Sequence, residues 1–189
     1  MSVQSRSGER LKPFFLALVQ QSFEQLRMGD RDIADYLATV LTDFSRSDRL
    51  LWLREAHGYN LRNAVEKVIA SLGSDTGERR LNERALRKHV GDYTLFMSGL
   101  FRSFVERHGV LDLYLAEGKR AYHAVSELDV ALYRPGFLLF EELSQRFESY
   151  SGALDYMRKC YFAAAPGSNP FAGFLRQIEH LVRGSLSNN

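Results

Sequence analysis

Residues 30–44 read DRDIADYLATVLTDF and carry the clearest structural signal in the chain. Apolar side chains recur in this stretch at intervals of three and four residues, which places them on one face of an α-helix. Asp30 stands at the expected N-cap position, directly after Gly29. The pattern therefore predicts a helix that buries one face, formed by Ile33, Tyr36, Leu37, Val40, Leu41 and Phe44.

Helical spacing recurs on both sides of this stretch, and no credible alternating strand pattern accompanies it. We expect a first helix that starts at Pro13 and is closed by Gly29, and a short helix at 48–54 that buries Trp52. Further helices are expected at 61–72, 78–109, 111–128, 137–150, 154–162 and from 169 onward, and those at 137–150 and 154–162 are either one helix or two separated near Gly152. The prediction is an all-α, compact bundle of six to eight helices with no sheet.

The polar stretch 73–77 has the length of an ordinary loop between helices rather than of a domain linker. We therefore expect residues 1–189 to form a single helical domain. Within it, residues 1–10 and the tail at 185–189 are expected to lack regular structure.

Cys160 is the only cysteine, which excludes an internal disulfide and a cysteine-based zinc site within one chain. Its spacing relative to Met157 predicts a small buried side chain, and a single cysteine suits a reducing cytoplasm. The apolar run Phe14–Val19 is too short for a signal peptide, and no stretch approaches the roughly 20 apolar residues of a membrane span. We expect a soluble cytoplasmic protein without membrane contact.

The sequence lacks the motifs of several kinds of metal-binding and catalytic site. No Glu precedes a His by three positions, so the di-iron motif of helical bundles is absent, and neither a phosphate-binding glycine loop nor a nucleophile elbow occurs. The sequence therefore predicts neither a metal nor a cofactor.

Helical ribonucleases of the HEPN type place an Arg four to six residues before a His. Arg84 with His89 and Arg102 with His108 have this spacing. With 20 arginines among 189 residues, two such pairs are close to what chance gives, so a ribonuclease is only a second alternative.

Residues 91–101, GDYTLFMSGLF, contain two glycines inside a helical pattern, each of which costs about 1 kcal/mol relative to Ala. Gly91 and Gly99 are eight residues apart and share a helix face. That face admits either a closely packed neighbouring helix, which we favour, or a ligand.

The GDYxLFxSGxF segment, followed by Asp112-x-Tyr114 and by the GxxAY segment at 118–122, resembles a family of uncharacterised bacterial all-helical proteins. The resemblance covers residues 80–128. Many members of that family have a second aromatic residue beside the position of Tyr114, which this chain lacks. The resemblance implies a helical fold and carries no function or catalytic residues with it.

Two groups of residues are candidates for binding. If the helices at 80–108 and 110–128 are neighbours, their polar side chains form a pocket for a small molecule. The ligand-binding candidates are Asp92, Tyr93, Ser98, Arg102, Tyr114, Lys119, Tyr122 and His123. The anion-binding candidates form a basic stripe of Arg80, Arg84, Arg87 and Lys88, although a solvated helix face explains this stripe more simply and nucleic acid is disfavoured.

The absence of catalytic signatures favours a non-enzymatic helical protein-interaction or regulatory module. Its expected partner is another protein or a second copy of the chain. A small-molecule-binding protein or enzyme with a polar pocket around Asp92 is the first alternative.

Overall fold

The computed structural model describes residues 3–45, 76–162, 173–178 and 180. The regular elements in these ranges are all α-helices, which confirms the predicted all-α class. They are α1 (Val3–Gln25), α2 (Arg31–Ser45), α5 (Thr76–Leu100), α6 (Arg102–Arg107), α7 (Leu111–Ala131), α8 (Phe137–Gln145) and α9 (Phe147–Tyr161), and residues 173–178 are helical as well. The predicted helices at 48–54 and 61–72 lie outside the described residues.

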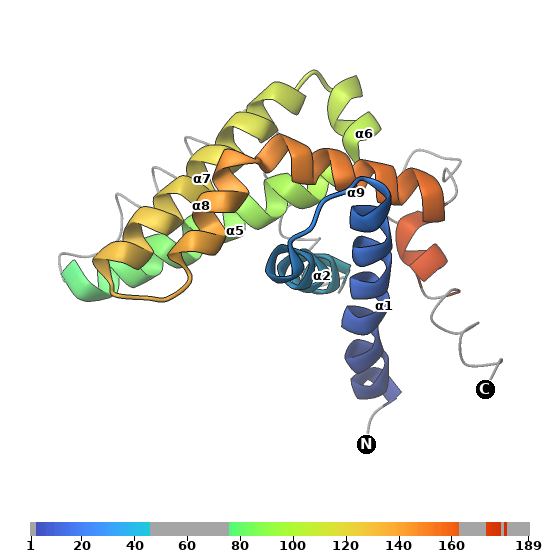
Figure 1. The fold of residues 1–189 in the computed structure, drawn as a ribbon, viewed down its shortest axis with the longest axis horizontal. Coiled ribbons are helices and arrows are strands. Elements are labelled where there is room, and N and C mark those ends of the chain that lie inside the picture. Colours follow the sequence, from blue (N-terminus) through green and yellow to red (C-terminus); the bar gives the residue numbers. More distant parts are fainter. Residues whose placement is uncertain (1–2, 46–75, 163–172, 179, 181–189) are drawn as a thin grey trace.

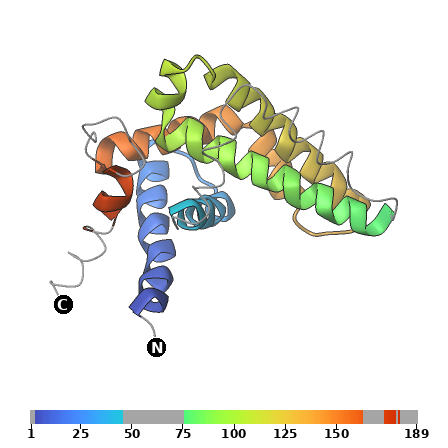
Figure 2. The ribbon, with the colours of Figure 1, turned by 180° about the vertical axis from the view of Figure 1, so that it is seen from behind.

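The long helices α5 and α7 run side by side, and α8 and α9 fold back along them (Figure 1). The view from behind shows the same long pair, with α1 standing across one end of it and α2 lying between α1 and the pair (Figure 2). The buried core is rich in aromatic rings from several helices, including Phe15, Phe44, Phe96, Phe147 and Tyr150. Within the described part of the chain, no helix combines the length and the apolar character needed to cross a bilayer.

Helix α2 matches the sequence pattern closely. The Asp30 carboxylate accepts hydrogen bonds from the backbone N–H groups of Asp32 (2.9 Å) and Ile33 (3.0 Å), so Asp30 is the predicted N-cap. The apolar face is buried, while Asp32 and Asp35 on the other side are exposed. This helix therefore contributes one face to the core, as expected.

Helix α1 differs from the expectation at both ends. It begins at Val3 rather than Pro13, so it includes residues 3–10, for which we expected no regular structure, and Pro13 lies inside it. It ends at Gln25 instead of at Gly29, and the chain turns at Arg27, whose φ is 55°. Proline marks a helix start only by preference, and several residue types can close a helix.

The single long helix expected at 78–109 is divided at Phe101 into α5 and α6. Phe101 has φ of −115° and ψ of 29°, outside helical values, and its ring is buried among Phe96 and Phe174. The second half ends at Gly109, whose φ is 67°, as the sequence predicts. The residue at the break is neither Gly nor Pro, and its ring packs in the core.

The region after residue 136 forms two helices, but the break lies at Arg146 and not near Gly152. Gly152 is inside α9. Cys160 is exposed near the end of α9, so its predicted burial is wrong. The last buried residue of α9 is Met157, and the buried face does not extend to Cys160.

Candidate functional site

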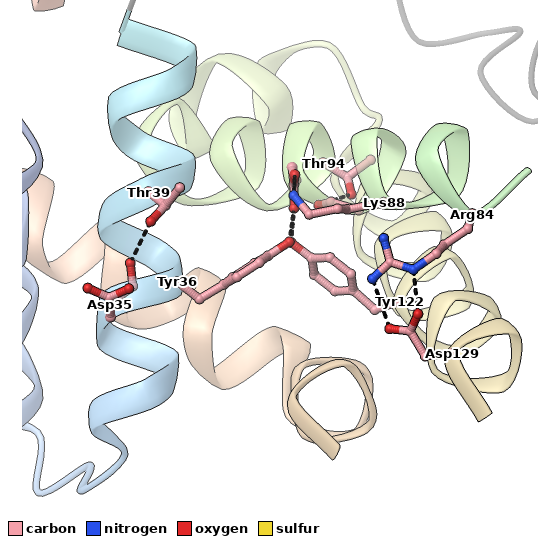
Figure 3. A network of polar contacts seen from close by, with 10 residues as sticks. Asp35, Tyr36, Thr39, Arg84, Lys88, Thr94, Tyr122 and Asp129 are labelled. Atoms are coloured by element: carbon pink, nitrogen blue, oxygen red, sulfur yellow. Dashed lines mark hydrogen bonds and ion pairs between the residues drawn. The ribbon is translucent and has the colours of Figure 1, made fainter. Parts of the chain in front are cut away.

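Three helices meet at one carboxylate, that of Asp92 in α5. Its Oδ1 atom accepts hydrogen bonds from the hydroxyls of Tyr36 in α2 (2.5 Å) and Tyr122 in α7 (2.9 Å). Its Oδ2 atom lies 2.7 Å from Nζ of Lys88, one helical turn earlier in α5. Figure 3 shows the rings of Tyr36 and Tyr122 converging from opposite sides beneath Lys88. We call Tyr36, Lys88, Asp92 and Tyr122 the Asp92 network.

The side chains of Lys88 and Phe140 pack against the tyrosine rings of the Asp92 network. The Lys88 ammonium lies 5.0 Å from the centre of the Tyr36 ring, a cation–π distance. The rings of Tyr36 and Tyr122 both contact Phe140 of α8, with centroids 5.5 and 5.7 Å away. Asp92 is therefore buried among rings, with the Lys88 ammonium in direct contact and the Arg84 guanidinium close enough to interact electrostatically.

The tyrosines of the Asp92 network act as hydrogen-bond donors. Burial raises the pKa of Tyr122 well above its usual value, and the nearby Asp92 carboxylate raises it further because it disfavours a second negative charge. The same two causes raise the pKa of Tyr36. Both hydroxyls therefore stay protonated at neutral pH, which suits a structural network and not a general base.

The glycines of α5 serve close packing. A Cβ atom at Gly91 would stand 2.5 Å from Cε1 of Tyr122, and one at Gly99 would stand 2.6 Å from Cβ of Leu154. Gly118 of α7 packs in the same way, since a Cβ atom there would overlap the Phe147 ring. The glycine face thus receives the protein's own side chains, in agreement with the packing interpretation of this segment.

The other ligand-binding candidates are distributed over separate contacts. The hydroxyls of Tyr93 and Tyr114 lie 3.3 Å apart, and burial is the main cause that raises the pKa of each. Ser98 accepts a hydrogen bond of 2.9 Å from Ser151 of α9. These two pairs connect α5 to α7 and to α9, and neither includes Asp92.

Three candidates lie at the surface. Arg102 pairs with Glu106 at 3.1 Å, Lys119 pairs with Glu148 of α9, and His123 lies 3.7 Å from Glu127. Of the eight predicted residues, the structure brings Asp92 and Tyr122 together in one network, whereas the remaining six contact other partners.

The basic stripe of α5 is largely used within the protein. Arg84 forms a double contact with the Asp129 carboxylate of α7, with Nη2 to Oδ2 at 2.9 Å, and its guanidinium lies 5.5 Å from the centre of the Phe140 ring. Lys88 belongs to the Asp92 network, and Arg87 pairs with Glu83 at 3.3 Å. Arg80 is exposed.

Two polar groups of these contacts are not indicated by the sequence, the Asp129 carboxylate and the Tyr36 hydroxyl. The Asp129 side chain is completely buried, and Arg134 lies 3.5 Å from its Oδ1 in addition to Arg84. The Tyr36 ring packs on the inward face of α2, as predicted, and its hydroxyl reaches Asp92. No local pattern distinguishes these two residues from ordinary surface and core positions.

The two Arg–His pairs of the ribonuclease alternative do not act together in this geometry. The His89 ring packs on Phe44 at 5.7 Å while Arg84 is held by Asp129. His108 caps the end of α6, with Nδ1 2.8 Å from the carbonyl oxygen of Phe104, and Arg102 binds Glu106. Each partner of a pair is engaged elsewhere.

Among the described residues, no group of three or more His, Cys, Asp and Glu side chains is arranged to hold a metal ion. Comparisons with protein families, with curated proteins and with solved structures found no match to this chain. The resemblance carried by residues 80–128 stays a prediction.

Large apolar side chains are exposed at one end of the molecule. Arg84 contacts both Asp129 and Phe140, so the start of α5, the end of α7 and the start of α8 lie together at this end. The exposed side chains there are Leu81 (47%), Val130 (57%), Tyr133 (98%) and Leu138 (63%). We call these four residues the tip.

Tyr133 of the tip adopts a left-handed backbone conformation with φ of 53°. Its N–H donates to the carbonyl of Val130 (3.2 Å), and the Arg134 N–H donates to that of Asp129 (2.8 Å). This pair of bonds is a Schellman motif, in which glycine is the usual residue at the position of Tyr133. Gly109 and Arg27 occupy the same position at the ends of α6 and α1.

Proposed function

We propose that this protein is a non-enzymatic interaction module that binds another protein through the tip. The observation that carries the proposal is Tyr133, an aromatic residue that is 98% exposed and held in a conformation that favours glycine. A left-handed conformation costs an L-residue about 1–2 kcal/mol. The Tyr133 ring is exposed in the described structure, so no burial of the ring offsets this free energy. An aromatic ring at such a position is best explained by a contact outside the chain.

The polar interior supports a role without catalysis. The Asp92 carboxylate is occupied by two tyrosine hydroxyls and one lysine, and the glycine face beside it is filled by Tyr122 and Leu154. A small-molecule site at Asp92 would require these contacts to be broken. A cytoplasmic location, suggested by the single cysteine, accompanies the proposal.

The experiment places a photo-crosslinking amino acid at position 133 and, as a control, at position 27 in the full chain. Both positions are exposed and have the same backbone conformation. A protein crosslinked from position 133 and not from 27 is then identified, purified and titrated against the wild type and against Tyr133→Gly and Arg27→Gly.

The expected result is that Tyr133→Gly weakens this affinity by about tenfold or more, as loss of an aromatic anchor does, while Arg27→Gly leaves it unchanged. Equal crosslinking from both positions, or an affinity that does not depend on Tyr133, would contradict the proposal.

A further inference from the structure

The loop between α7 and α8, which carries Tyr133, is attached to the last turns of α7 at both of its ends. At its start, the two Schellman hydrogen bonds hold the backbone of Tyr133 and Arg134. At its end, the Ser126 hydroxyl donates a hydrogen bond of 3.0 Å to the carbonyl oxygen of Phe137, the first residue of α8. The path of the loop is therefore defined on both sides of the Tyr133 ring.

The loop passes beside the carboxylate of Asp129, which is completely buried. Oδ1 of Asp129 lies 3.5 Å from Nε of Arg134, the residue that follows Tyr133. Oδ2 lies close to the backbone at Gly136, where an added Cβ atom would stand 3.3 Å away. One buried carboxylate thus contacts the loop at two places after Tyr133.

Arg84 holds the Asp129 carboxylate from the neighbouring helix α5. Its Nη2 donates to Oδ2 at 2.9 Å and its Nε donates to Oδ1, and Figure 3 shows the two groups facing each other. The same guanidinium lies 5.5 Å from the centre of the Phe140 ring in α8. A bidentate contact of this kind leaves the carboxylate little freedom to rotate. Asp129 therefore connects the loop to α5 as well as to α7.

These contacts bear on Tyr133 because its backbone conformation, with φ of 53°, is unfavourable for a residue other than glycine. Such a conformation persists only where the surrounding structure holds it. Packing of the ring does not hold it, since the ring is 98% exposed. The next residue, Arg134, is instead attached to Asp129 twice, through its backbone N–H and through its guanidinium.

We propose that Asp129 is a positioning residue for the tip. Held by Arg84, its carboxylate binds Arg134 and keeps Tyr133 in the left-handed conformation, so that the ring is presented in one orientation. An aromatic anchor that is ordered before binding loses less conformational entropy when a partner arrives. This inference rests on the proposed interaction function and adds the residue that prepares its anchor.

The test measures the order of the Tyr133 backbone amide by NMR relaxation in the full chain, without a partner. The variant is Asp129→Asn, which keeps the size of the side chain and removes its charge. The matched control is Glu117→Gln, because Glu117 is another buried carboxylate of α7 and pairs with Arg120 at 3.0 Å. We expect an order parameter of about 0.85 in the wild type and the control, and below about 0.6 in Asp129→Asn.

A second variant decides the question if Asp129→Asn does not fold because it leaves Arg84 facing an amide. Arg134→Ala removes the partner that is 48% exposed and leaves the contact between Asp129 and Arg84 in place. Its control is Arg120→Ala, since Arg120 is 47% exposed and also pairs with a buried carboxylate. We expect the Tyr133 amide to lose order in Arg134→Ala and to keep it in Arg120→Ala. A Tyr133 amide that stays ordered in Arg134→Ala, or that loses order equally in the control, would overturn the inference.

The consequence for binding is measured with peptides selected from a random library on the immobilised full chain. Only peptides whose binding is lost with Tyr133→Gly are kept and titrated. Their affinity should fall about tenfold with Asp129→Asn and less than about twofold with Glu117→Gln. An unchanged affinity for a chain in which the Tyr133 amide has lost its order would overturn the positioning role.

The two measurements separate this inference from the function on which it rests. A Tyr133 amide that keeps its order in the variants, together with peptides that depend on Tyr133, would overturn the inference and leave the interaction function standing. The absence of any peptide that depends on Tyr133 would contradict the interaction function, even where the order parameters show that Asp129 holds Tyr133.

Discussion

The ring of Tyr122 lies against the backbone of Gly91, where a Cβ atom would stand 2.5 Å from Cε1 of the ring. The hydroxyl of the same ring donates to Asp92, the next residue of α5. One side chain of α7 thus uses two consecutive residues of α5, one for close packing and the other for a buried hydrogen bond. At this contact α5 and α7 approach each other closely.

A methyl group at Gly91 is expected to destabilise the fold. Gly91→Ala forces the fully buried Tyr122 ring to shift, and such overpacking lowers the free energy of unfolding by about 1–3 kcal/mol. The matched control is Gly152→Ala in α9, where no atom lies within 4 Å of the added Cβ. The control should raise the free energy of unfolding by about 0.5–1 kcal/mol, because Ala favours a helix over Gly. Urea denaturation of both variants checks this, and a neutral Gly91→Ala would contradict the packing described.

The Asp92 network is expected to contribute to stability through its two buried hydroxyls. Tyr122→Phe and Tyr36→Phe each remove one hydrogen bond and keep the ring, so each should lower the free energy of unfolding by about 0.5–1.5 kcal/mol. Tyr156→Phe is the control, because its hydroxyl bonds Gln25 at the surface, and we expect a change within about 0.5 kcal/mol.

Asp92→Asn should cost more than either tyrosine variant. The amide removes the charge that pairs with Lys88 and leaves one acceptor oxygen for the donors that now share a carboxylate. Thermal and urea denaturation should show a loss of about 1–3 kcal/mol. An Asp92→Asn variant as stable as the wild type would rule out a structural role for this network.

The left-handed residues give a prediction of opposite sign. Tyr133→Gly and Arg27→Gly relieve the backbone conformation at exposed sites, so each should raise the free energy of unfolding by up to about 1 kcal/mol. Gly109→Ala is the reverse change in the same motif and should lower it by about 1 kcal/mol. Denaturant midpoints decide the signs, and a loss of stability in Tyr133→Gly would mean that its ring packs within the chain.

Alkaline pH should unfold the protein. Burial raises the folded-state pKa of Tyr36, Tyr93 and Tyr122 above the value in the unfolded chain. Their contribution to stability is therefore complete below about pH 10 and is lost as the pH rises above it, by up to about 1.4 kcal/mol per pH unit for each tyrosine. Phenolate absorbance and circular dichroism should change together, and Tyr122→Phe should make the decline less steep. Ionisation of these three residues near pH 10 in a folded chain would contradict the burial.

The sequence predicted correctly those features of a helix that depend only on residues within or next to that helix. The spacing from Ile33 to Phe44 predicted the buried face of α2, and Asp30 predicted its N-cap, because both follow from helix geometry alone. Gly109 likewise marked the end of α6 through its left-handed conformation. The glycines at 91 and 99 indicated close packing before the packed side chains were known.

The sequence by itself determined the helical class, the faces that turn inward and the absence of several catalytic motifs. Only the tertiary structure decided that Tyr36 reaches Asp92 across 56 positions and that Arg84 binds Asp129 across 45. It also decided the helix breaks at Phe101 and Arg146 and the exposure of Tyr133. The physical reason is that helical periodicity specifies which side chains share a face, whereas hydrogen-bond partners depend on how whole helices cross, and that crossing is set by the summed packing of many distant residues.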